Sequence, residues 1–412
     1  MKKANLVTIP TLVESPFIIA TIGGHTFGSF TNGSYSDAGA HMNVEFPNYM
    51  KSLNIVKVNG TVNTYVLNFS YQVAYGEDPN KLDKIFSKAS KDRKITLSYG
   101  DWNAPSQIYK EETGIITNIT SSLNMGNSSI DYTINCTSDA IGLTASQFTF
   151  PAKEAKPSDV LKNMLSNVRY GMKDVFTGMK DTSKVLSNDL IASNDKKVKL
   201  AAQKGVTPLE YMNYLVNSMV DVNSGVNDST SKYFLSIHDD LNNDLGGTYF
   251  KVSEVGQSSA SSPSADTYEL DVNFPSDNFI TQFKVNNDQS WSILYDYSTS
   301  VGKENYSYKI NNDGKIVTTY APTLIRGVGG EISASESNWW KLMTEFPITA
   351  SLTMKGLARP SLLMSYVKLN VWFHGGLKHI SSGLYVITKQ QDSIDSSGYK
   401  TTLDLLRVGG DN

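Results

Sequence analysis

Two histidines in the segment His374–His379 are the residues of this chain that most resemble a pair of metal ligands. They stand five positions apart in a Gly-rich turn, and the neighbouring positions carry no Cys, Asp or Glu. A zinc site needs several such ligands at short and regular spacing. We therefore interpret His374 and His379 as residues of a surface loop, and we predict no metal site in this chain.

The string His238-Asp239-Asp240 could supply an acid–base group or ligands for a metal ion. It lies in a stretch rich in Ser, Asn and Asp, and these residues favour turns and helix starts. We therefore expect a solvated loop or the start of a helix at these three positions.

Other patterns for catalysis or nucleotide binding are incomplete. Neither Gly23-Gly24-His25 nor Gly327–Glu331 opens a nucleotide-binding strand–helix unit, so each predicts a turn or a bulge. The chain has no Gly-x-Ser-x-Gly elbow, and Cys136 continues an alternating strand pattern that predicts burial. Any two of the 40 acidic residues could meet as a catalytic pair, which leaves sugar hydrolysis open. We predict that the protein is not an enzyme and has no catalytic, cofactor-binding or metal-binding residue and no cofactor.

Length and composition indicate a globular protein with more than one domain. A chain of 412 residues exceeds one ordinary core, and roughly two to four domains are expected. The net charge of −3 argues against binding driven by contacts to phosphate, and a single cysteine excludes an intrachain disulfide bond. Met1-Lys2-Lys3 is not followed by an apolar h-region, and no run of about 18 apolar residues occurs. Neither a signal peptide nor a transmembrane helix is therefore expected.

Alternating patterns predict that residues 1–150 are mostly strand. Large apolar residues occupy every second position from Tyr65 to Val73, which predicts a half-buried strand after a turn at Asn59-Gly60. Asp78 and Pro79 are typical of a helix N-cap and first helical position. The apolar face of that helix is expected at Leu82, Ile85, Phe86 and Ala89. Further strands are expected at Leu53–Val58, Ile95–Tyr99, Gly114–Ser122 and Ser129–Thr137.

Helical spacing replaces this alternation in the middle of the chain. Pro157-Ser158 precedes apolar residues at helical spacing up to Val168, and Thr207–Glu210 is a capping box that starts a second helix. We expect Asp195–Lys204 to be a loop or an exposed helix. Residues 222–232 and 252–266 are poor in apolar residues, and Ser258–Ala265 is expected to be a linker or mobile loop.

The remainder of the chain returns to strands. A turn at Asn311–Gly314 predicts a hairpin, and Ser335–Met343 predicts a short helix. Strands are expected from Tyr268 to Phe274, from Trp291 to Tyr297, and at Ile348–Met354 and Ser365–Phe373. We therefore predict an α+β protein, mostly β, with two β-barrel or sheet domains and a helical insertion between them. The expected boundaries are 1–150 for the first β domain, 151–232 for the helical segment, 233–266 for linker and loop, and 267–412 for the second β domain.

The last strands carry a resemblance to a known family. A turn at Asp395–Gly398 predicts a hairpin over Gly383–Val408. Its Gly-Leu-Tyr-Val and Gly-Tyr-x-Thr-x-Leu-x-Leu-x-Arg strands resemble the end of phage baseplate hub proteins, which are related to the N-terminal part of type VI secretion spike proteins. Leu352–Gly356 and then Arg359-Pro360-Ser361 are similar to the family's strand, glycine and proline turn, although the family often has glycine where Ser361 stands. In the second strand of the hairpin, alternation places Tyr399, Thr401, Leu403 and Leu405 on one face and Lys400, Thr402 and Asp404 on the other.

The resemblance implies a structural protein of a contractile injection system. Each β domain would have the tail-tube fold, a sheet curled into part of a barrel with a helix on its flank. The protein would be the homotrimeric central hub of the virion tail baseplate, assembled in the host cytoplasm. It would join the tail tube protein to the central spike protein and contact the tape measure protein and baseplate wedge proteins. Genomic DNA would only pass through its lumen, and no direct membrane insertion is implied.

Two other classes of function stay open. One is a hexameric distal tail or tube-initiator protein of a phage tail, which differs from a hub in its stoichiometry. The other is a tail-associated cell-wall hydrolase or sugar-binding protein, which would show paired acids or a tier of aromatic residues in a cleft.

Overall fold

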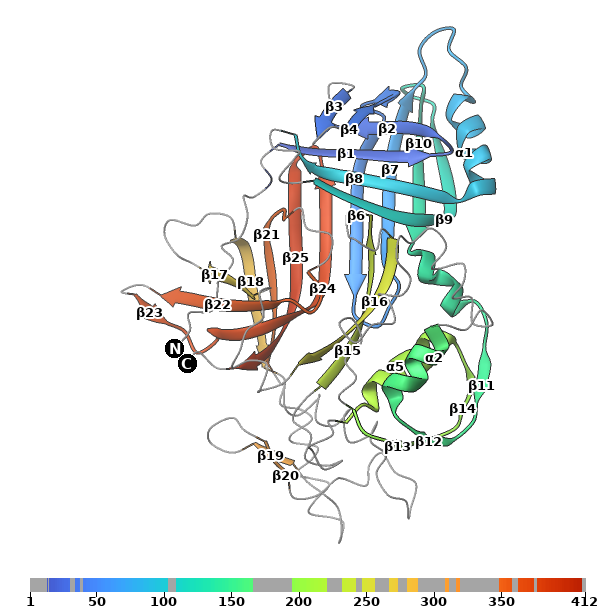
Figure 1. The fold of residues 1–412 in the computed structure, drawn as a ribbon. Helices are drawn as coiled ribbons and strands as arrows, with labels where there is room; N and C mark the ends of the chain where they lie inside the picture. The colour runs from blue at the N-terminus through green and yellow to red at the C-terminus, as the bar shows by residue number, and fades with distance from the viewer. Residues whose placement is uncertain are drawn as a thin grey trace.

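The computed structural model shows a protein built mostly from β-strands, with its helices gathered at two places (Figure 1). The α+β, mostly β class predicted from the sequence is confirmed. The structure describes residues 13, 15–29, 34–37, 40–102, 109–165, 195–220, 232–241, 247–255, 267–272, 280–287, 308–310, 316–318, 348–357, 362–373 and 376–409.

The N-terminal strands form one curled sheet, here called the first β unit. Its strands pair antiparallel in the order β2–β1–β8–β9–β10–β7–β6, in which hairpins of consecutive strands are joined by the distant pairings β1–β8 and β7–β10. Their bounds are β1 Pro16–Ile22, β2 His25–Ser29, β6 Met50–Val58, β7 Thr64–Gln72, β8 Lys94–Asp101, β9 Tyr109–Asn124 and β10 Ser129–Thr137. The short strands β3 Ser34–Asp37, β4 Ala40–Asn43 and β5 Phe46–Pro47 lie beside it.

The predicted alternation of β7 is confirmed, because every second side chain from Tyr65 to Tyr71 is buried. These side chains meet helix α1 Lys81–Asp92, whose residues Leu82, Ile85 and Phe86 belong to the same apolar cluster. The helix begins at Lys81 rather than at Pro79. The Asp78 carboxylate accepts a hydrogen bond from the Asn80 N–H at 2.9 Å, which holds residues 78–80 in a turn. The structure does not describe the side chain of Ala89.

In the described part of the middle of the chain, short strands surround two helices. The helices α2 Pro157–Leu165 and α5 Pro208–Asn217 pack together, and the capping box predicted at Thr207–Glu210 is present. Asp195–Lys204 is not a loop or exposed helix, because it contains a strand and the start of another. Val198 and Leu200 are buried in the apolar cluster of the helices while Lys199 between them is exposed, and this alternation is typical of a strand. Around them lie η1 Asp139–Thr144, β11 Phe148–Phe150, β12 Lys153–Ala155, β13 Val198–Leu200 and β14 Gln203–Val206.

The C-terminal strands form the second β unit, ordered β18–β21–β25–β24–β22–β17. The predicted closing hairpin is confirmed, with Asp395 paired to Gly398 across its turn and with Leu403 and Leu405 buried. Gly356 is explained by close packing, since a Cβ there would lie 2.1 Å from the Tyr399 ring. Bounds are β17 Thr267–Val272, β18 Ile280–Asn287, β21 Ile348–Lys355, β22 Tyr366–Phe373, β23 Leu377–Lys378, β24 Gly383–Asp395 and β25 Gly398–Gly409.

Several sequence-based expectations lie outside the described residues. They are Val168, Ser258–Ala265, the strand end at Phe274, the strand from Trp291 to Tyr297, Gly327–Glu331, the helix at Ser335–Met343, and Arg359–Ser361. The turn Asn311–Gly314 is also outside, although the flanking strands β19 Tyr308–Ile310 and β20 Ile316–Thr318 do pair. The division into domains stays a prediction.

The two β units are continuous through one long strand. The first half of β24 pairs with β22, and its second half pairs with β6 of the first β unit, from Lys389↔Val58 to Ile394↔Leu53. Much of the segment expected to be linker and loop is also strand. β15 Lys232–Asp240 and β16 Gly247–Val255 form a hairpin, and Asp240 pairs with Glu112 of β9. Among the described residues, no helix is both long and apolar enough to cross a membrane.

Candidate functional site

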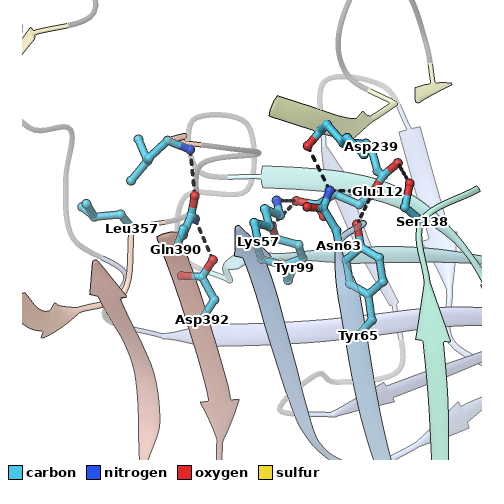
Figure 2. Close-up of polar contacts among 12 residues, drawn as sticks. Lys57, Asn63, Tyr65, Tyr99, Glu112, Ser138, Asp239, Leu357, Gln390 and Asp392 are labelled. Atoms are coloured by element: carbon cyan, nitrogen blue, oxygen red, sulfur yellow. Dashed lines mark hydrogen bonds and ion pairs between the residues drawn. The ribbon is translucent and has the colours of Figure 1, made fainter. Parts of the chain in front are cut away.

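A buried polar network lies where the two β units and the β15–β16 hairpin meet (Figure 2). Charged side chains are almost never fully buried unless they are paired, so such a network marks a specialised part of the molecule. Its charged members are Lys57 on β6, Glu112 on β9, Asp239 on β15 and Asp392 on β24, and each is at most 2% exposed.

Lys57 and Glu112 form the ion pair at the centre of this network. The ammonium group donates to one Glu112 carboxylate oxygen, and the Tyr99 hydroxyl donates to the same oxygen at 2.6 Å. Burial raises the pKa of Glu112 to about 7, and the positive charge of Lys57 opposes that rise. Among the described residues, Lys57 is the one buried lysine or arginine.

The Asp239 carboxylate accepts hydrogen bonds from four neutral side chains. The Asn63 amide donates to it at 2.7 Å, the Tyr65 hydroxyl at 2.9 Å, and the Ser138 and Thr248 hydroxyls each at 2.6 Å. These donors come from the start of β7, the end of β10 and strand β16. The carboxylate therefore fastens the β15–β16 hairpin to the first β unit.

On the second β unit, the Asp392 carboxylate is also buried and hydrogen-bonded, as Asp239 is on β15. The Thr401 hydroxyl donates to it at 2.6 Å and the Gln390 amide at 2.7 Å, while the Gln390 carbonyl accepts from the Leu362 N–H at 2.7 Å. Burial raises the pKa of Asp392 to about 6, and these donors together with the charge of Lys57 oppose the rise. Gln390 lies opposite Lys57 in the β24–β6 register. Lys57 therefore lies between the carboxylates of Asp392 and Glu112 (Figure 2).

The expectation for His238-Asp239-Asp240 is wrong. These residues are not a solvated loop or helix start but the buried end of strand β15. His238 stacks on Tyr249 with ring centroids 4.8 Å apart and lies 2.9 Å from the Ser236 hydroxyl. Burial lowers the pKa of His238 to about 3, so the imidazole is neutral at physiological pH. The Asp239 carboxylate can be buried because hydrogen-bond donors from other strands surround it.

The remaining candidates do not converge on this network. Cys136 is buried as predicted, and burial raises the pKa of its thiol to about 12. Gly23-Gly24 forms the predicted turn between β1 and β2, with positive φ at both glycines. His379 is exposed and lies 2.7 Å from the Ser381 hydroxyl, whereas His374 lies outside the description. Within the described ranges, no group of three or more His, Cys, Asp and Glu is placed to hold a metal ion.

Lysine, glutamate and tyrosine side chains in contact can in principle transfer protons. Here the Lys57 and Glu112 side chains are 1% and 0% exposed, so no substrate can approach them in this conformation. Each group satisfies a neighbour on another strand, which is the arrangement expected of a network that fixes strand register. The sequence patterns did not predict this buried network, although Leu53, Ile55 and Lys57 share the inward face of one alternating strand.

No protein-family model matches this chain, and no curated protein matches it in sequence. Solved structures do match. A tail protein from Neisseria meningitidis MC58 aligns over 95% of this chain and 97% of its own, with 12% identity and a TM-score of 0.50. The 43 kDa tail protein of prophage MuSo2 from Shewanella oneidensis covers the same shares, with 12% identity and a TM-score of 0.51.

A third similarity is to an E. coli component of the type VI secretion system, described as structurally similar to the T4 bacteriophage tail proteins gp27 and gp5. It covers 88% of this chain and 76% of its own, with 9% identity and a TM-score of 0.46. The first two similarities extend over nearly the whole chain, so this protein has the fold of phage tail proteins.

Proposed function

We propose that this protein is a structural component of a phage-type tail, namely the trimeric central hub that joins the tail tube to the central spike. The observation that carries the proposal is the fold shared with two tail proteins over 95% of this chain. The closing hairpin also supports it, because the strand that begins with the hub-like residues Gly383–Val386 continues into the segment that pairs with β6.

A ring of three copies would place two β units of each chain around one channel. The continuity of β24 supports this arrangement, because β24 sets the two units of one chain at a constant relative position. In such a ring, one face would contact the tail tube protein and the other the spike protein. The net charge of −3 is compatible with a lumen that lets DNA pass without gripping it.

A non-enzymatic role fits the buried network. Its acids and its lysine contact one another across strands, and none of them is more than 2% exposed. Incubation of the purified chain with peptidoglycan tests the hydrolase alternative. We expect no release of soluble fragments, and steady release that scales with protein concentration would favour a tail-associated hydrolase.

The stoichiometry of the purified protein tests the hub proposal directly. Mass photometry over a range of concentrations should show a species at three times the chain mass of 45.3 kDa. Image averages of that species should show a ring with three-fold symmetry. A hexamer would favour the distal tail or tube-initiator alternative, and a monomer that also fails to form trimers in tail particles would contradict both.

A further inference from the structure

The buried network at the junction of the β units contains more negative than positive charge. Its carboxylates belong to Glu112, Asp239 and Asp392, and in the described part of the chain Lys57 supplies the one buried positive charge. An uncompensated charge is costly in a protein interior, and an acid in that position usually binds a proton instead. The excess of carboxylates over ammonium groups therefore indicates that the network holds a proton.

One oxygen of Glu112 is the atom placed to carry that proton. Its Oε1 accepts from the Lys57 ammonium group and, at 2.6 Å, from the Tyr99 hydroxyl. Its Oε2 is buried and has no hydrogen-bond partner among the described residues. A buried oxygen without a donor is unfavourable in an ionised carboxylate, whereas a protonated oxygen needs no donor and itself donates. The Tyr65 hydroxyl, which donates its proton to Asp239, also interacts with Glu112 and can accept from it.

The other titratable neighbours of Glu112 add negative charge or none. Burial raises the pKa of Glu112 to about 7, and the nearby charge of Asp239 on β15 adds to that rise. Asp240 of the same strand is 7% exposed and lies opposite Glu112 in the β15–β9 pairing. Burial also raises the pKa of three neighbouring tyrosines on β7, β8 and β25, which are therefore neutral, namely Tyr65, Tyr99 and Tyr399. Lys57 is therefore the cation that offsets the charge of Glu112.

Lys57 also faces a carboxylate of the second β unit. It lies on β6 between Glu112 and Asp392, and its charge opposes the burial that raises the pKa of Asp392 (Figure 2). The rings of Tyr99 and Tyr399 pack edge to face beside both acids, with centroids 6.2 Å apart. One ammonium group cannot neutralise two ionised carboxylates in an interior. The two acids are therefore held without excess charge only while one of them carries a proton.

We propose that Glu112 binds a proton at and below neutral pH, and that the loss of this proton loosens the pairing of β24 with β6. With Glu112 protonated, the charge of Lys57 is left to Asp392, and the charge of Asp239 stays with its four neutral donors. When Glu112 ionises, water relieves the excess negative charge, and separation of β24 from β6 admits it. The junction is thus a pH-sensitive fastening of the two β units, and this inference does not depend on the proposed assembly.

Hydrogen exchange of backbone amides, measured by mass spectrometry, tests the fastening. The values pH 6 and pH 9 lie on either side of the pKa of Glu112, and the peptides of interest cover β6 and β24. After correction for the chemical exchange rate, their protection should fall about tenfold between these pH values, because ionised Glu112 favours the open junction. Amides of helix α2, which belongs to a different apolar cluster, should keep their protection.

Glu112→Gln is the decisive variant, because a neutral amide has nearly the shape of the protonated acid. Its β6 and β24 amides should keep their protection from pH 6 to pH 9. The matched control is Glu154→Gln at an exposed position of β12, which should behave as the wild type does. Circular dichroism spectra that match the wild type establish that both variants are folded.

Infrared spectroscopy detects the proton itself. The wild type should show the band of a protonated carboxyl group at pH 6 and lose it at pH 9. Isotope labelling of glutamate should shift this band, since Glu112 is the one buried glutamate in the described part of the chain. This measurement also decides the question if Glu112→Gln does not fold.

Three results would overturn the inference. An absent band at pH 6 would mean that Glu112 is ionised and that a donor such as water satisfies its Oε2. An equal loss of protection in the wild type and in Glu112→Gln would assign the pH response to another group. A loss of protection in α2 as large as that in β24 would mean that pH acts on the whole fold rather than on the junction.

Discussion

Two regions of this protein reverse the usual distribution of side chains. At the junction of the β units, charged residues are buried, whereas large apolar residues are exposed near the β9–β10 turn and on the β22–β23 hairpin. The buried charges have partners on other strands of the same chain, since Lys57 pairs with Glu112, Thr248 donates to Asp239 and Thr401 donates to Asp392. The exposed apolar side chains are at least half exposed at these positions, so they contribute little buried surface to the single chain. Changes at the junction should therefore alter stability far more than changes at the exposed apolar positions.

The largest effect is expected from Lys57→Met, which leaves the Glu112 carboxylate buried without its counter-charge. Removal of one partner of a buried ion pair costs about 3–5 kcal/mol of unfolding free energy. Urea denaturation measures this loss, and Lys51→Met on the exposed face of the same strand is the control. Adding Glu112→Leu to Lys57→Met should restore much of the stability, because no unpaired charge then remains. A loss below about 1 kcal/mol for Lys57→Met would contradict a tightly paired network.

Leu403→Ala measures the loss of unfolding free energy when a side chain of an ordinary apolar core is truncated, for comparison with the junction. Leu403 is 1% exposed in the cluster of the second β unit, so its truncation should cost about 2–5 kcal/mol. The control is Leu123→Ala at the exposed end of β9, where little buried apolar surface is lost. Equal losses for the two leucines in urea denaturation would mean that the buried and exposed regions do not differ as described.

The pH dependence of stability should be set by the junction. The pKa of Asp392 is raised to about 6, above the value of about 4 in an unfolded chain. The folded state therefore binds more protons between these values, and the stabilisation is complete below pH 4 and lost as the pH rises through 6. Relative to Asp392→Asn, the wild type should lose about 1–3 kcal/mol between pH 4 and pH 7. A relative gain in urea titrations over that range would contradict the raised pKa.

The smallest effect is expected from the two histidines of the segment His374–His379. Changing His374 and His379 together to Ala should alter the unfolding free energy by less than about 0.5 kcal/mol, as surface-loop substitutions usually do. Tail assembly and trimer formation should persist. Elemental analysis of wild type and variant provides the second readout, and a stoichiometric metal lost in the variant would establish a site that we do not predict.

Alternating strands and helix caps could be predicted from the sequence because they depend on neighbouring residues. Strand β10, the capping box at Thr207 and the inward face of β25 all lie within about one residue of their predicted positions. The start of α1 was predicted too early, because the same Asp78 side chain can cap a helix or close a turn.

The junction could not be predicted because its partners are remote in sequence. Asp239 stands among residues typical of loops, and its burial depends on donors near residues 63, 138 and 248. Lys57 and Asp392 do leave a weak signal. Each occupies an inward position in an alternating strand, where a charged residue requires a partner that only the fold reveals.

The pairing of β24 with β6 also has a consequence for how this chain folds during its synthesis. Ile394 and Tyr399 belong to the apolar cluster of the N-terminal strands, so that cluster cannot close until the ribosome has passed residue 399. At about 5–20 residues per second, the edge of β6 waits unpaired for many seconds. An unpaired edge of this kind recruits strands from other molecules. Nascent or truncated chains should therefore depend on chaperones until the C-terminal hairpin reaches β6.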